Sequence, residues 1–233
     1  MASVAESSSG VAGFLSSALR PLFARPVFIL ILLLGVLLTA SNIVILHNAP
    51  VKGQMPPVAF IAAAFVRVAG LLVMSVAILR RINASPRPAW SPDTGFWLFV
   101  LTFAVEAAAT GALTMAAGGP EAQLAGLLVN VGATFVFAPL AAWFIALAVE
   151  RPLAWRPAPW LRGWSLWLAP YLIWMVLLAI PLGAMHQAID TRLVKGAGEG
   201  FWPLALIDGP LSLILCIVGL ALASEAYRRV ARG

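Results

Sequence analysis

Long apolar stretches are the feature of this sequence that most limits how it can fold. A helix needs about 20 apolar residues to cross the hydrocarbon core of a bilayer. We predict such spans at Pro26–Leu46, Pro57–Leu79, Phe96–Ala117, Leu124–Val149, Leu166–Met185 and Leu204–Ala223. Hydrophobic residues make up 62% of the chain and charged residues 10%, against about 25% charged residues in soluble domains. The predicted fold class is therefore all-α: a polytopic integral membrane protein with six helices in one transmembrane domain, residues 26–233.

The N-terminal region differs from the rest of the chain. Residues 1–10 are polar and small, and we expect a mobile tail without a cleaved signal peptide. Apolar residues from Val11 to Phe23 recur at steps of three and four, which places them on one face of a helix. We predict a short interfacial amphipathic segment over residues 11–25, whose regular part ends at Pro21.

Prolines inside the predicted spans indicate irregular helices. Pro139 in the fourth span and Pro170 and Pro181 in the fifth are expected to kink them and to free local carbonyls. The start of the sixth span has two interpretations. Asp208-Gly209-Pro210 is typical of a helix start, in which case residues 201–207 form an interfacial or re-entrant piece and the crossing runs from Pro210 to about Arg228.

The distribution of basic residues predicts the orientation. Cytoplasmic loops of membrane proteins carry an excess of Lys and Arg. Three basic residues, Lys52, Arg192 and Lys195, would lie on the side opposite the termini, against eleven on the side of the termini. These eleven are Arg20, Arg25, Arg80, Arg81, Arg87, Arg151, Arg156, Arg162, Arg228, Arg229 and Arg232. We predict a multi-pass protein of the cell inner membrane with both termini cytoplasmic.

The loops on the predicted cytoplasmic side are rich in arginine and tryptophan, most of all residues 151–167. Indoles favour the level of the headgroups, and arginines attract acidic lipids. The bilayer and its anionic headgroups are therefore the expected partners, together with a second copy of the chain or a larger membrane complex. The basic residues form no single block and no nucleic-acid module is visible, so we expect no nucleic-acid partner.

Two charged residues lie near the middle of predicted spans: Arg67 in the second and Glu106 in the third. A lone charge there costs about 3 to 10 kcal/mol or more unless it finds a partner or water, and such residues are functional candidates. Antiparallel packing of the two spans would let Arg67 and Glu106 form an ion pair. Asn42 and Asn130 are the other strongly polar residues in spans, and they either join a substrate- or ion-binding site or simply hydrogen-bond across helices.

A second polar group is expected on the outer side. It consists of His47, His186, Asp190 and Asp208, with His186 and Asp190 on one face if their helix continues that far. Histidines and carboxylates are ligand types for divalent metals, and two histidines can hold haem. The spacing matches no recognised ligand motif, so we predict no metal and no cofactor.

Catalytic motifs are absent from the sequence. It contains no GxSxG, HExxH, CxxC or Walker-type glycine loop, and its single cysteine, Cys216, is expected to be an apolar filler within the last span. We therefore assign no catalytic residue and do not favour an enzyme. Three functions remain: a transporter or channel for a small solute or ion, with a polar midplane site between the second and third spans; an integral subunit that binds and stabilises a larger membrane complex; and an enzyme acting on a lipid or quinone.

Overall fold

The computed structural model describes residues 10–50, 54–116, 123–195 and 202–232, and within these ranges the regular structure is helical, with no strand. Six helical spans are long and apolar enough to cross a membrane. They are Arg25–His47, Val58–Ile82, Thr94–Leu113, Ala125–Val149, Leu168–Ile189 and Pro203–Arg232. The predicted fold class is confirmed.

The first three spans are single helices: α2 (Arg25–His47), α3 (Val58–Ile82) and α4 (Thr94–Ala116). The fourth span is interrupted at Pro139 and the fifth just before Pro181, as predicted, whereas Pro170 lies in the first turn of a regular helix and interrupts nothing. A 3₁₀ turn that contains Pro139, η4 (Ala138–Leu140), joins α5 (Gln123–Phe137) to α6 (Ala141–Val149). A π-helical segment, η6 (Met175–Ala179), separates α8 (Leu168–Trp174) from α9 (Ile180–Lys195). Pro181 has no N–H to donate to the carbonyl of Leu177 within η6, which explains the irregularity there.

The sixth span is one long helix, α10 (Trp202–Arg232), which continues through Pro210. The interpretation in which residues 201–207 form a separate re-entrant piece is therefore wrong for the described part of that stretch. A proline inside a helix removes one hydrogen bond, and neighbouring helices in a membrane can compensate for it. Gly209 serves close packing here, because a Cβ on it would lie 2.7 Å from the Cα of Thr39 in α2.

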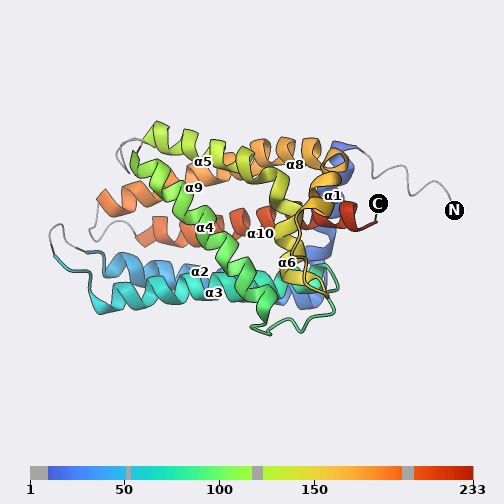
Figure 1. Ribbon diagram of the computed structural model, residues 1–233. Helices are drawn as coiled ribbons and strands as arrows, with labels where there is room; N and C mark the ends of the chain where they lie inside the picture. Colours follow the sequence, from blue (N-terminus) through green and yellow to red (C-terminus); the bar gives the residue numbers. More distant parts are fainter. Residues whose placement is uncertain (1–9, 51–53, 117–122, 196–201, 233) are drawn as a thin grey trace.

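The helix predicted in residues 11–25 is also present, as α1 (Val11–Leu19) followed by the 3₁₀ turn η2 (Arg20–Phe23). It crosses one end of the bundle, next to the end of α10 (Figure 1). Phe14 and Ala18 are fully buried, and the guanidinium of Arg229 lies 4.9 Å from the centre of the Phe14 ring. We call this the terminal end of the bundle; it also carries residues 83–93 and 150–167, with the short helices α7 (Ala158–Arg162) and η5 (Trp164–Leu166).

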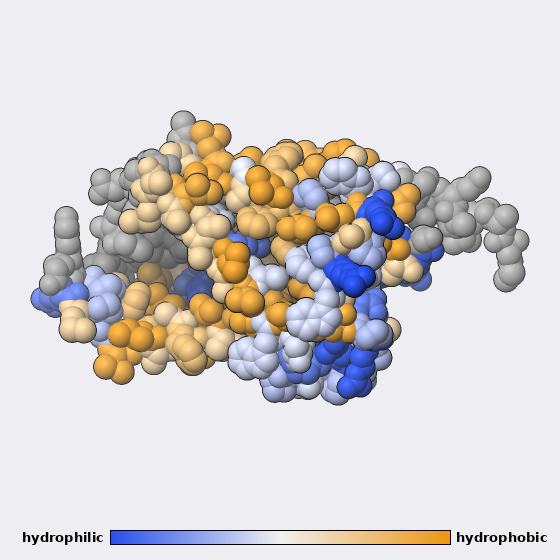
Figure 2. Space-filling view, viewed as in Figure 1, coloured by the Kyte–Doolittle hydropathy of each residue, from blue (hydrophilic) through white to orange (hydrophobic). Residues whose placement is uncertain are grey.

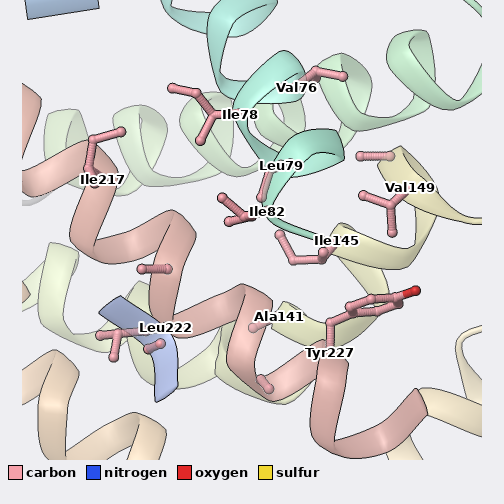
Figure 3. Packing of buried hydrophobic residues seen from close by; sticks show 14 of the residues in the cluster. Val76, Ile78, Leu79, Ile82, Ala141, Ile145, Val149, Ile217, Leu222 and Tyr227 are labelled. Carbon is pink, nitrogen blue, oxygen red and sulfur yellow. The ribbon is translucent and has the colours of Figure 1, made fainter. Parts of the chain in front are cut away.

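The core is densest toward the terminal end, where α3, α6 and α10 meet (Figure 3). Buried residues labelled there are Val76, Ile78, Leu79, Ile82, Ala141, Ile145, Val149, Ile217, Leu222 and Tyr227. Trp167, which the sequence placed with the headgroup-level tryptophans, is fully buried and packs edge-on against Tyr171. Trp90, Trp97 and Trp155 are more than half exposed.

A buried arginine organises the loop between α3 and α4. Arg80 is 2% exposed, and its guanidinium donates to the carbonyls of Pro88 and Ser91, to the Asp93 carboxylate at 2.7 Å, and to the carbonyl of Ala148 at the end of α6. Arg87 repeats the arrangement. It donates to the carbonyl of Glu150 and pairs with Asp93 at 2.7 Å.

These contacts hold the start of α4 against the end of α6. As a result α4 packs mainly on α5 and α6 and makes few contacts with α3, whereas α3 packs on α2. The expectation that the second and third spans pack closely as antiparallel neighbours is therefore wrong.

Two of the eleven basic residues on the side of the termini are buried. Arg80 and Arg87 make contacts within the protein and do not face headgroups.

Replacing Asp93 should destabilise the fold. Its carboxylate joins both arginines and accepts the N–H of Phe96 at 3.0 Å, which caps the start of α4. We expect Asp93→Ala to lower the free energy of unfolding by about 2–4 kcal/mol, since a cap and charge-assisted hydrogen bonds are lost. Asp93→Asn keeps the capping oxygen, so its free energy of unfolding should fall less than that of Asp93→Ala. Thermal unfolding in detergent measures both, and an unchanged melting temperature for Asp93→Ala would contradict this role.

The Asp93 carboxylate also makes the stability of the fold depend on pH. Burial raises the pKa of Asp93, but the hydrogen bonds from Arg87 and the Phe96 N–H and the charge of Arg80 outweigh burial and lower the pKa below its ordinary value. A lowered pKa contributes stability that is complete above the pKa of the unfolded chain and is lost as the pH falls through the folded pKa. Between about pH 6 and pH 3 the wild type should therefore lose more stability than Asp93→Asn.

Candidate functional site

A cavity of about 660 Å³ lies among the membrane-spanning helices. On the face shown in Figure 2, hydrophilic residues are visible at the bottom of a hollow between otherwise apolar helices. Several helices each contribute one stripe of side chains at the three- and four-residue steps of a helix face. The stripes include Arg67, Leu71 and Ser75 of α3; Phe99, Phe103 and Glu106 of α4; and Ser212, Cys216 and Gly219 of α10.

The centre of a polar network on one wall of this cavity is Asp208 of α10, whose side chain is fully buried. One carboxylate oxygen, Oδ1, lies 2.5 Å from Nδ1 of His186 in α9. The other, Oδ2, accepts a hydrogen bond from the Asn42 side chain in α2 at 2.7 Å and lies 3.7 Å from Nη2 of Arg67 in α3. One carboxylate thus connects four helices.

Arg67 completes the network. Its Nη1 donates to Oδ1 of Asn42 and its Nη2 donates to Oγ of Ser212 at 3.0 Å, while 19% of its side chain remains exposed. Ser212 Oγ also lies 3.4 Å from His186 Nδ1. Arg67 is nine residues inside α3, or about 14 Å along the helix axis at 1.5 Å per residue. The network therefore lies well within the membrane and not at its surface.

The structure joins residues that the sequence placed in two separate groups. Arg67 and Asn42 came from the predicted midplane group, and His186 and Asp208 from the predicted outer group. The two groups are separate in the prediction because a helix start at Asp208-Gly209-Pro210 would lie at the membrane surface, whereas α10 begins at Trp202 and carries Asp208 more than one turn inward. Ser212 was missed for the same reason, since it lies four residues after Asp208 on the same helix face.

Glu106 lines the cavity from α4 and forms no ion pair with Arg67. Phe99, Phe103 and Glu106 follow at steps of four and three, so they share one face of α4. Among the side chains that the structure describes, none makes a hydrogen bond or an ion pair with Glu106. The direct pair expected between Arg67 and Glu106 is thus replaced by the pair of Arg67 with Asp208.

The remaining predicted site residues take no described part in the network. His47 is the last residue of α2 and is exposed. Asn130 and Asp190 lie in α5 and α9, but their side chains are outside the described ones. Among the residues described, no three His, Cys, Asp or Glu side chains come together as metal ligands would.

A hydrolytic reading of Ser212, His186 and Asp208 does not fit their geometry. In a catalytic triad the carboxylate holds one ring nitrogen of the histidine while the serine contacts the other. Here both Asp208 and Ser212 approach Nδ1. The arrangement fixes the position of the imidazole but does not pass a proton from the serine through the ring.

Comparisons with protein-family models, with curated proteins and with solved structures each gave no match. The function of the protein is therefore inferred from the chemistry of the cavity.

The network predicts which charged residues are energetically coupled. Removing one partner of a buried ion pair typically costs about 3–5 kcal/mol, and removing both restores part of the loss. We expect Arg67→Met and Asp208→Asn each to lower the melting temperature strongly and the double variant to recover part of it. Arg67→Met and Glu106→Gln should instead be additive within about 0.5 kcal/mol. Thermal unfolding in detergent tests both cycles, and strong coupling only between Arg67 and Glu106 would contradict the network.

Proposed function

We propose that this protein is a membrane transporter that carries a small solute through the cavity. The observation that supports this most is that Arg67, Glu106 and His186 line one space within the membrane. Its volume of about 660 Å³ falls in the range of ligand pockets, which are mostly apolar with a few convergent polar groups. Ionisable residues at this depth commonly mark substrate or ion pathways.

The hypothesis of a non-catalytic subunit explains fewer of the charged residues in the cavity than the transporter hypothesis does. A non-catalytic subunit would need charged residues only to fix helix packing, and Arg67 with Asp208 would suffice for that. Such a role gives no reason for a further ionisable residue, Glu106, in the lining of the same cavity. One observation does favour a partner: the helix α4 is mostly exposed, although lipid alone can cover it.

We also propose that the terminal end faces the cytoplasm in an inner membrane. Exposed arginines at this end, Arg81, Arg151, Arg156 and Arg162, support the orientation because cytoplasmic segments are enriched in basic residues. Hydrophilic residues gather at this end on the face shown in Figure 2. The same four arginines are available to anionic headgroups.

The natural single cysteine offers a direct test of transport. Cys216 lines the cavity, and the chain has no other cysteine. In vesicles of either orientation, a membrane-impermeant thiol reagent should label Cys216 from both sides, because a transporter exposes its site alternately. Gly219→Leu should slow the labelling, since a Cβ on Gly219 meets no atom within 4 Å and a longer side chain would project into open space.

A thiol in apolar surroundings reacts slowly, so a second reporter is useful. Leu215→Cys in a Cys216→Ser background places a thiol elsewhere on the cavity wall. Labelling of neither reporter in vesicles, with full labelling after denaturation, would support the sealed subunit. Labelling from one side only, under all conditions, would indicate that the cavity is a binding pocket open to one side, and it would contradict transport.

A further inference from the structure

We infer that the solute is a lipophilic organic cation, which competes with a proton for the Glu106 carboxylate. This inference rests on the proposed function and names its substrate class. It follows from the charge balance and the lining of the cavity.

The two walls of the cavity differ in how their charged residues are paired. On one wall the positive charge of Arg67 is balanced by Asp208, 3.7 Å away, and both groups are further satisfied by Asn42. His186 lies against the same carboxylate, with its Nδ1 2.5 Å from Oδ1 of Asp208. On the other wall Glu106 has no described ion-pair partner. A cation in the cavity would thus meet a carboxylate that has no described counter-charge, whereas an anion would meet an arginine that is already paired with Asp208.

The lining selects among cations. Five aromatic side chains border the cavity: Phe99, Phe103, Phe137, Phe144 and Tyr171. Aromatic faces attract cations, most strongly when the cation is desolvated, and they serve in recognition of quaternary ammonium groups. Hard metal cations require six or more oxygen ligands, which this mostly apolar lining does not supply. A cation with apolar substituents satisfies both the carboxylate and the aromatic wall.

Competition with a proton follows from the position of Glu106. An ionised carboxylate buried among apolar side chains costs free energy unless a positive charge offsets it, so a proton and a bound cation are alternative partners for Glu106. The other titratable or charged groups that line the cavity or lie on its polar wall are Arg67 on α3, Tyr171 on α8, His186 on α9, and Asp208 and Cys216 on α10. Arg67 and Asp208 balance each other, which leaves Glu106 as the group whose charge the cation would offset.

The test uses two probes of the same shape and opposite charge. Tetraphenylphosphonium should bind to the purified protein in detergent, and tetraphenylborate should bind much more weakly. Calorimetry in weakly buffered solution should show proton release, and the affinity for tetraphenylphosphonium should fall as the pH is lowered. Glu106→Gln should weaken its binding at least about tenfold, because the charge attraction is lost in a medium of low dielectric constant.

Two further variants separate charge from folding. Glu106→Asp keeps the charge and should retain part of the affinity and its pH dependence. Glu150→Gln, which removes a carboxylate outside the residues that line the cavity, should leave binding unchanged. Unaltered binding in Glu106→Gln, or equal binding of the anionic and cationic probes, would overturn the inference. If Cys216 is still labelled from both sides in that case, the transporter proposal survives with another solute. If Cys216 is not labelled from both sides either, both the transporter proposal and the cation inference are wrong.

Discussion

The buried carboxylate of Asp208 is the interaction on which the membrane part of this structure depends most. It connects α2, α3, α9 and α10 through Asn42, Arg67 and His186. In a bilayer the apolar surfaces of helices gain little by leaving lipid, so packing and polar contacts set which helices associate. A carboxylate that satisfies three partners on three other helices therefore does more to fix their arrangement than any pair of apolar side chains.

Much of the fold was predictable because its signals are local. Span length, helix periodicity and proline positions depend on neighbouring residues, and they predicted the six spans, α1 and the irregularities at Pro139 and near Pro181. The tertiary contacts of the site were not local. Arg67 and Glu106 were paired on the assumption that consecutive spans are neighbours, but Arg80 and Arg87 draw the start of α4 to the end of α6. Nothing in the spacing of these arginines reveals which carbonyls they bind.

The error at Asp208 has a different origin. Asp, Gly and Pro in succession are good helix-start residues when water surrounds them, because the side chain can cap and Pro fits the first turn. Within a membrane bundle the same three residues have other uses. Gly209 permits the close approach of α2. Asp208 does not cap the helix but accepts hydrogen bonds from side chains of other helices. Cap signals therefore predict less in apolar spans than in soluble helices.

The loop between α3 and α4 has a mechanical consequence. Arg80 and Ser85 bind the last two carbonyls of α6, and Arg87 binds the carbonyl of Glu150 just after it. Arg228 donates to the backbone of α1, so these helices are fastened together at one end of the bundle. Farther from this end, the network around Asp208 joins α2, α3, α9 and α10 to one another. The bundle is therefore held by polar contacts at two levels along its length, one at the terminal end and one within the membrane.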